Sequence, residues 1–170
     1  MSKPPILSVV GKSNVGKTTF LEKLIAELKR RGYRVATVKH DVHGFDIDHP
    51  GKDTWRHAAA GADTILIASH QKLAMIKKWE GERSLDELAG WLLEDVDIVF
   101  TEGFKRKDKP KIEVVRKARS EELICSADEL LAIVSDVKFE LDIPCFGLDA
   151  AAGLVDLIEK KYSLKPPVPG

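Results

Sequence analysis

Cysteine is scarce in this sequence: its two thiols, Cys125 and Cys145, lie 20 residues apart and belong to no metal or redox motif. A disulfide framework is therefore excluded, and we expect buried free thiols in a reducing compartment. Long apolar runs are also missing, since no segment approaches the ~18 residues that suggest a membrane span. The first residues lack the apolar core of a signal peptide, so the expected location is the cytoplasm.

A net charge is absent as well. The 170 residues carry 27 basic and 27 acidic side chains, which gives a formal charge of zero. A protein that binds nucleic acid or a membrane through bulk charge needs a basic excess, so we expect neither partner. Internal repeats and low-complexity tracts are missing too. The length fits a single nucleotide-binding domain, residues 1–170, with a sizeable core.

What the sequence does contain is a phosphate-binding loop. Residues 11–18, Gly-Lys-Ser-Asn-Val-Gly-Lys-Thr, fit the pattern G-x-x-x-x-G-K-[ST]. An apolar run at residues 5–10 precedes the loop, and a segment with helical periodicity, residues 17–30, follows it. Strand, glycine loop and helix is the order that this motif requires. The segment therefore predicts a site for the phosphates of a nucleotide.

Each residue type in this loop has a physical role. Gly11 and Gly16 allow backbone angles that are closed to other residues, so that successive N–H groups can point at one anion. The helix that begins near Lys17 adds unpaired N–H groups and the positive end of its dipole. Lys17 reaches the β- and γ-phosphates, and the Thr18 hydroxyl is a ligand for Mg²⁺.

Strand and helix patterns alternate along the rest of the chain and predict an α/β fold. We expect the three-layer fold of P-loop NTPases, a mostly parallel sheet flanked by helices, with some antiparallel edge strands. The 73–76 strand is expected to be antiparallel because a short connection precedes it. Alternation over residues 111–116 indicates a half-buried or edge strand. Core packing is the preferred interpretation of Trp91.

An acid at the end of an apolar strand is the second landmark. The stretch 97–104 reads Asp-Ile-Val-Phe-Thr-Glu-Gly-Phe. A P-loop enzyme places a carboxylate that holds Mg²⁺, directly or through water, at such a strand end. Asp97 fits a looser version of the pattern, but it lies at the start of the strand, which faces away from the site in a parallel sheet. We therefore assign this role to Glu102, with an ordinary strand-exit acid as the alternative.

The sequence allows two interpretations for each of two polar loops. Residues 39–53 are rich in His and Asp and directly follow a strand. The carboxyl ends of strands carry the ligand site in open α/β sheets, so this loop is either a switch-like contact to ligand or Mg²⁺ or a solvated turn. The basic loop 105–111 follows Glu102 and is either a surface loop or a contact to an anion or a partner.

The sequence resembles the MobB family of molybdopterin-guanine dinucleotide biosynthesis adaptor proteins. The resemblance is carried by residues 11–19, 38–41 with the loop that follows, 48–56 and 101–105. The P-loop is shared by many proteins, whereas Asp-x-Pro-Gly-Lys-Asp-Thr from residue 48 is far more specific to this family.

This resemblance implies a homodimer that binds GTP with Mg²⁺ and hydrolyses it weakly. It also implies partnership with the MobA-type nucleotidyltransferase that joins GMP to molybdopterin, with molybdopterin as a further candidate ligand. Lys17, Asp41 and Glu102 are the catalytic candidates, and Thr18, Asp41 and Glu102 are the metal-ligand candidates. The nucleotide contacts are expected from Gly11, Lys12, Ser13, Asn14, Val15, Gly16, Lys17, Thr18, Thr19 and Asp136.

Other interpretations stay open. Guanine-specific P-loop GTPases usually carry Asn-Lys-x-Asp, whereas residues 135–138 read Ser-Asp-Val-Lys. Asp136 can still accept two hydrogen bonds from guanine, so GTP and ATP both remain candidates. Lys12 either reaches the partner subunit's phosphate, as in dimeric nucleotide switches, or is a surface lysine. The protein could instead be an ATP-dependent small-molecule kinase or ligase similar to dethiobiotin synthetase, or a non-catalytic nucleotide-binding adaptor.

Overall fold

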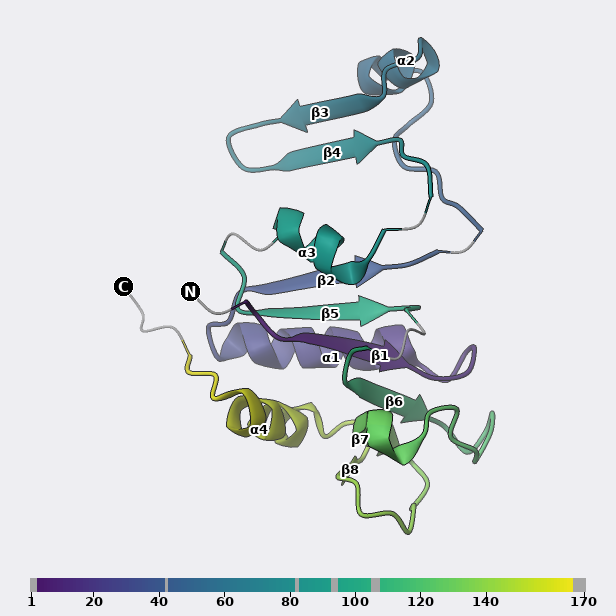
Figure 1. Ribbon diagram of the computed structural model, residues 1–170, viewed down its shortest axis with the longest axis vertical. Coiled ribbons are helices and arrows are strands. Elements are labelled where there is room, and N and C mark those ends of the chain that lie inside the picture. Colours follow the sequence, from purple (N-terminus) through teal and green to yellow (C-terminus); the bar gives the residue numbers. More distant parts are fainter. Residues whose placement is uncertain (1–2, 42, 82, 93–94, 105–107, 167–170) are drawn as a thin grey trace. The chain divides into compact units, whose positions relative to one another are not determined.

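A computed structural model describes residues 3–41, 43–81, 83–92, 95–104 and 108–166 (Figure 1). Its contacts divide the chain into two units, residues 1–40 with 88–170 and residues 41–87. The elements in chain order are β1 (Ile6–Val10), α1 (Lys17–Arg30), β2 (Val35–Lys39), α2 (Asp53–Ala59), β3 (Thr64–Ala68), β4 (Leu73–Lys77), α3 (Leu85–Leu92), β5 (Ile98–Glu102), β6 (Lys111–Val115), the 3₁₀ turn η1 (Ala127–Glu129), β7 (Leu130–Ser135), β8 (Cys145–Phe146) and α4 (Ala151–Tyr162).

A six-stranded parallel sheet forms the centre of the first unit. The strand order is β2-β5-β1-β6-β7-β8, so β1 lies between β5 and β6. Helices α1 and α4 pack against each other, and their apolar faces join those of the strands in one core. Large side chains such as Phe20, Leu24, Phe100 and Leu154 are fully buried there. The expected α/β fold with a mostly parallel sheet is confirmed.

Strand β6 is central and buried, so the expectation of a half-buried or edge strand at residues 111–116 was wrong. All five residues of β6 are buried, between β1 and β7. Its polar side chains are satisfied inside the protein. Lys111 Nζ pairs with Glu129 Oε1 at 3.1 Å. Glu113 accepts the N–H groups of Ile124 at 2.6 Å and Cys125 at 3.0 Å. Alternation of polar residues therefore does not mark solvent exposure here.

The second unit holds a small antiparallel sheet. Strands β3 and β4 pair with Leu66 opposite Met75, which confirms the antiparallel direction expected for the fourth strand. Ser84 caps α3 together with Glu87: the Glu87 N–H donates to Ser84 Oγ at 3.2 Å, and the Ser84 N–H donates to Glu87 Oε2 at 2.9 Å.

Two expectations about burial were wrong. Trp91 is 51 % exposed. The buried residue of the first turn of α3 is Leu85, and Trp91 follows six positions later, about 120° round the helix axis. Both cysteines are free thiols, but Cys145 is exposed because it lies in the short edge strand β8.

The first residues of the basic loop, 105–107, lie outside the described part. Within that part, no helix has the length and apolarity to span a membrane.

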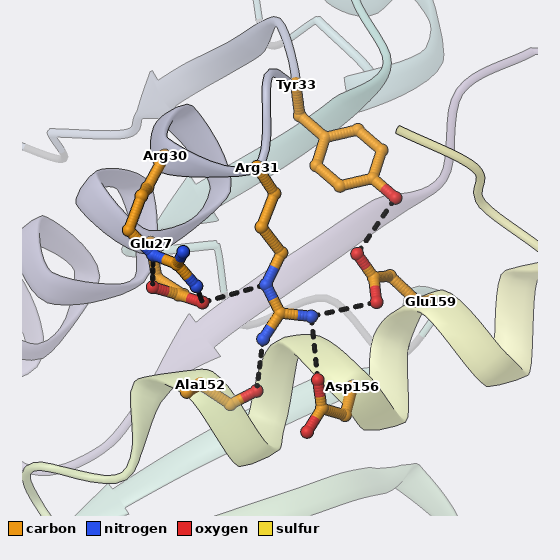
Figure 2. A network of polar contacts seen from close by, with 7 residues as sticks. All are labelled: Glu27, Arg30, Arg31, Tyr33, Ala152, Asp156 and Glu159. Carbon is orange, nitrogen blue, oxygen red and sulfur yellow. Dashed lines mark hydrogen bonds and ion pairs between the residues drawn. The ribbon is translucent and has the colours of Figure 1, made fainter. Parts of the chain in front are cut away.

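The carboxyl end of α1 is joined to α4 by a charged network, which Figure 2 shows from close by. The Arg31 side chain is only 16 % exposed, and its Nε donates to Glu27 Oε1 at 2.8 Å. Its Nη1 donates to both Asp156 Oδ1 at 2.7 Å and Glu159 Oε2 at 2.8 Å. A further bond goes to the carbonyl of Ala152 at 3.1 Å. One guanidinium thus links two helices that are far apart in the sequence.

The network also shifts the titration of its members. Hydrogen bonds from Arg30 and Arg31 lower the pKa of Glu27 from 4.5 to about 2. Burial, together with the Glu159 carboxylate that accepts its hydroxyl proton, raises the pKa of Tyr33 to about 12. Because the pKa of Glu27 is lower in the folded state, its contribution to stability is complete above pH 4.5 and is lost as the pH falls through about 2.

We expect Arg31→Ala to lower the free energy of unfolding by about 2 kcal/mol, since it removes the donor that Glu27, Asp156 and Glu159 share. Arg30→Ala is the matched control: it removes a partner of the same Glu27, but the Arg30 side chain is 70 % exposed and its loss should matter less. Urea unfolding at neutral pH measures both variants. The deficit of Arg31→Ala should narrow at pH 2–4, where Glu27 becomes protonated. Equal losses from the two arginines would contradict the role assigned to burial.

Candidate functional site

The glycine loop after β1 has the backbone that an anion cradle requires. Gly11 and Gly16 have φ angles of 146° and 94°, and Asn14 adopts a left-handed φ of 61°. A Cβ on Gly11 would collide with the carbonyl oxygen of Val114 in β6, so only glycine fits there. The loop is thereby pressed against the neighbouring strand and held in one shape.

Helix α1 begins directly after this loop with an uncompensated positive end. No side chain caps its N-terminus, and its first turn, all of it described, contains no acid. The first N–H groups of a helix lack intrahelical partners and carry a partial positive charge. Lys17 adds a full charge at the same place. An anion is the ligand that this end can bind.

Lys17 itself lies folded against its own loop. Its Nζ donates to the carbonyl oxygens of Lys12 at 2.8 Å and Gly11 at 3.1 Å. These neutral acceptors hold the ammonium at the edge of the cradle. A phosphate oxygen is a stronger, charged acceptor, so the side chain is placed to exchange one partner for the other.

Thr18 and Glu102, which the sequence analysis names as candidate metal ligands, lie together. Thr18 Oγ1 donates to Glu102 Oε1 at 2.8 Å. Glu102 is the last residue of β5, in register with Val9 of β1 and Lys39 of β2. Hydroxyl and carboxylate oxygens beside a phosphate loop suit Mg²⁺, which completes its shell with phosphate oxygens and water. The residues present therefore fit this ion.

Gly103 fixes the direction in which the chain leaves β5. Its φ is 89°, and a Cβ there would lie 2.6 Å from the carbonyl oxygen of His40. The N–H of His40 in turn donates to the carbonyl of Glu102 at 2.9 Å. The ends of β2 and β5 are thus closely joined, which holds the backbone of Glu102 beside the glycine loop.

Asp97 lies at the other end of the same strand. It accepts the backbone N–H of Arg34 at 2.7 Å and pairs with the guanidinium of Arg34 at 2.9 Å, and this arginine holds the pKa of the carboxyl below its usual range. The strand direction expected from the sequence is confirmed. Asp97 forms its ion pair at the amino end of β5, whereas the glycine loop lies at the carboxyl end of the sheet.

A cavity of about 590 Å³ opens beside the glycine loop. Its lining residues are Ser13, Asn14, Gly16, Lys17, Thr18, Thr19, Glu102, Arg116 and Arg119. The two arginines were missed by the sequence reasoning. They follow β6, and the signal for them was the basic run after that strand. This basic run lies beside the glycine loop because β6 pairs with β1, and the sequence alone did not reveal that strand order.

A second, smaller cavity of about 240 Å³ shares Ser13 and Lys17 with the first. It is lined by Val9, Val10, Gly11, Lys12, Ser13, Lys17, Gly103 and Ile124. Aliphatic side chains form part of its wall, in contrast to the polar first cavity. The two cavities therefore offer different chemistry on either side of the glycine loop.

Lys12 and Asp136 both contact the segment that follows β6. Lys12 Nζ donates to Ser120 Oγ at 2.6 Å and pairs with Glu122 at 3.1 Å. Asp136, the residue after β7, accepts the N–H of Lys117 at 2.7 Å. A carboxylate has about four lone-pair sites, so this bond leaves Asp136 capacity for a ligand. Both side chains have a role within the chain, and their roles toward a ligand stay predictions.

Asp41 belongs to the second unit, residues 41–87. Its Oδ1 accepts the N–H of His43 at 2.9 Å in a local turn. Its role as a metal ligand or catalytic residue stays a prediction, as does the switch role of the loop 39–53. Among the described residues, no group of three or more His, Cys, Asp and Glu side chains could hold a metal ion. A Mg²⁺ ion held largely by phosphate needs no such group.

The fold and the loop together define the class of protein. A mainly parallel sheet whose central strand leads through this glycine loop into a helix is the arrangement of P-loop proteins.

The particular family follows from comparison with known proteins. The family model of MobB, described as "Molybdopterin guanine dinucleotide synthesis protein B", matches residues 6–136. The chain belongs to the MobB family. It is 36 % identical over 160 residues to the molybdopterin-guanine dinucleotide biosynthesis adapter protein of Escherichia coli K12, with 91 % of each chain covered. The adapter protein of Haemophilus influenzae is 35 % identical over 156 residues, or 91 % of this chain and 88 % of the relative.

Solved structures agree with this assignment. A crystal structure described as molybdopterin-guanine biosynthesis protein B has a TM-score of 0.73 at 33 % identity, and the match covers 92 % of this chain and 99 % of that one. The crystal structure of Bacillus subtilis MobB has a TM-score of 0.71 at 29 % identity, with 96 % and 99 % covered.

We expect Glu102→Gln to reduce the gain in nucleotide affinity that Mg²⁺ gives by about 10- to 100-fold, while the fold stays intact. The amide keeps the shape of the side chain but loses the charge that attracts the cation. Asp97→Asn, the same change at the other end of β5, is the control. Nucleotide affinity measured over a Mg²⁺ titration compares the two. If Asp97→Asn abolished the metal dependence and Glu102→Gln did not, the assignment of the metal to Glu102 would be reversed.

Proposed function

We propose that this protein binds GTP with Mg²⁺ and serves as an accessory protein in the conversion of molybdopterin to molybdopterin-guanine dinucleotide. The relatives named above are adapter proteins of that biosynthesis, and an adapter acts with a partner enzyme. The partner we propose is the MobA-type nucleotidyltransferase, in the cytoplasm. The observation that carries the nucleotide part is the Thr18–Glu102 pair beside an uncapped helix N-terminus, in one cavity of about 590 Å³.

The roles of the residues follow from their chemistry. The loop N–H groups cradle the phosphates, and Lys17 turns from its loop carbonyls to the β- and γ-phosphate oxygens. Thr18 and Glu102 would hold Mg²⁺, which supplies charge neutralisation at the phosphates. Glu102 is the one carboxylate among the described residues that line the cavity, and it already accepts a hydrogen bond from the Thr18 hydroxyl. With no second base among these lining residues, a water molecule there is weakly activated, which supports slow hydrolysis.

Guanine recognition is assigned to Asp136. It follows β7, which is separated from β1 by a single strand, and a carboxylate can accept both N–H groups of the guanine edge. Asp136→Asn keeps one oxygen to accept the Lys117 N–H but replaces the other oxygen by an amide NH₂. The variant therefore tests guanine recognition without removing the hydrogen bond to Lys117. An unchanged ratio of GTP to ATP affinity in this variant would move guanine recognition elsewhere.

A second candidate is an ATP-dependent kinase or ligase that acts on a small molecule. The smaller cavity supports it, because an acceptor held by the aliphatic wall there would lie next to Ser13 and Lys17. Such an enzyme would release phosphate or ADP with its small substrate alone. A GTP-binding accessory protein would instead show its effect in the presence of the transferase.

The test is dinucleotide formation by the transferase as this protein is titrated in, together with phosphate release from GTP and ATP. We expect stimulation by the wild type and a loss of about 100-fold or more in hydrolysis for Lys17→Ala, because a charged group aimed at the reacting phosphate is removed. Wild-type triphosphate affinity in Lys17→Ala would reject the P-loop assignment. A wild-type protein without effect on the transferase would favour the independent enzyme or a passive nucleotide-binding adaptor.

We further propose that the protein is a homodimer and that the β3–β4 sheet takes part in the contact. Leu66, Met75 and Leu73 lie on one face of this sheet and are 56 %, 48 % and 66 % exposed. An isolated two-stranded sheet is marginally stable, and an exposed apolar strand pair is a site for pairing with another chain. The expected contribution of residues 111–116 to such an edge is withdrawn, because β6 is buried.

Leu66→Lys should weaken dimerisation by about 10-fold or more, since it places a charge in the contact. Gln71→Lys adds the same charge at the turn between β3 and β4 and should leave the dimer intact. Sedimentation equilibrium of both variants and the wild type measures the association. A monomeric wild type would reject the homodimer, and equal association of wild type and Leu66→Lys would move the contact to another surface.

A further inference from the structure

Arg116 lies where a nucleotide would pass along the glycine loop. It is the first residue after β6, and β6 is the strand whose Val114 carbonyl abuts Gly11. A Cβ built on Gly16 would lie 3.7 Å from Nη2 and 3.9 Å from Cζ of Arg116. The guanidinium therefore stands against the last loop residue before α1, and it lines the cavity of about 590 Å³.

The cavity that this guanidinium lines holds other positive groups as well as the Glu102 carboxylate. Lys17 and the uncapped N-terminus of α1 line the same cavity. The Nε atom of Arg116 is buried and has no hydrogen-bond partner among the described residues, which also provide no ion pair for its guanidinium. The field of Arg116 reaches Asp149 and adds a small part to the lowering of that residue's pKa, but the main cause is Lys23, with which Asp149 pairs at 2.6 Å. A positive group that is partly desolvated among other positive groups is stabilised by an anion.

The segment after β6 is anchored so that Arg116 is held in place. The carbonyl of Arg116 accepts the N–H groups of Arg119 at 2.8 Å and Ser120 at 3.0 Å. Asp136 fixes the next residue, Lys117, at 2.7 Å. The buried Glu113 fixes the far end of the segment through Ile124 at 2.6 Å. Such anchoring fixes the backbone from which the Arg116 side chain extends before a ligand arrives.

We propose that Arg116 binds the α- and β-phosphates of the nucleotide from within the same chain, an inference that rests on the proposed nucleotide binding. The backbone of a P-loop cradles the α- and β-phosphates, while its lysine reaches the β- and γ-phosphates. Arg116 lies beside that backbone at Gly16, and the predicted metal ligands Thr18 and Glu102 mark the terminal end of the phosphate chain. Its charge therefore acts on the phosphates that GDP and GTP share. Arg119, on the exposed side of the same turn, adds a weaker, screened attraction.

The test compares GDP and GTP affinities of Arg116→Ala by calorimetry, with thermal unfolding without nucleotide as the check on folding. We expect both dissociation constants to rise by the same factor, about 10- to 100-fold, because a charge-assisted hydrogen bond to each is lost. Arg116→Lys keeps the charge without the planar fork and should fall between wild type and Arg116→Ala. Arg30→Ala removes an arginine at the far end of α1 and should leave both affinities unchanged.

The outcomes separate this inference from the function it rests on. If Lys17→Ala abolishes binding and Arg116→Ala binds as the wild type does, Arg116 has no such role, while the nucleotide site stands. If Arg116→Ala loses affinity for GTP alone, the guanidinium acts at the terminal phosphate and the assignment to the shared phosphates is overturned. If the wild type binds neither nucleotide, the proposed function fails and the inference with it.

Discussion

Close approach of backbone to backbone at the carboxyl edge of the sheet is the constraint on which the rest of this structure depends. At Gly11 a carbonyl of β6 occupies the place of a side chain, and at Gly103 a carbonyl from the end of β2 does the same. These contacts bring the exits of β2, β5, β1 and β6 to one edge. A larger residue at either position would move the exits apart, and the groups that meet at the glycine loop would no longer share one cavity.

Polar groups in the interior serve the same arrangement. Glu113 and Lys111 are buried in β6, where an all-apolar strand would pack more simply. Both side chains anchor other parts of the chain. Glu113 accepts the backbone N–H groups of Ile124 and Cys125. Lys111 pairs with Glu129, which caps η1 together with Ser126. Hydrogen bonds offset part of the desolvation cost of these buried charges, and a satisfied network defines one position for what it holds. The segment after β6 therefore has a definite shape beside the glycine loop without regular secondary structure of its own.

The sequence predicted what is local and missed what depends on strand order. The limits of α1 and the placing of Glu102 and Asp97 at opposite ends of β5 rest on periodicity and strand direction, which are visible in the chain itself. Burial of β6 was hidden because its alternating polar residues find partners from η1 and from Ile124 and Cys125. Arg116 and Arg119 could be recognised only once β6 was known to lie next to β1. Trp91 had the expected helical spacing but lies on a face that its short helix leaves open.

The hydrogen bonds that Lys17 makes to its own loop affect which anions the loop can bind tightly. Its ammonium already holds two acceptors, the carbonyls of Gly11 and Lys12. A small anion with few oxygens would exchange these bonds for a similar number and gain little, whereas a chain of phosphates presents oxygens to the lysine, the loop N–H groups and the helix end at once. We therefore expect the loop to favour ligands with several phosphate groups, and we expect abundant simple anions to compete poorly for it even though its charge is positive.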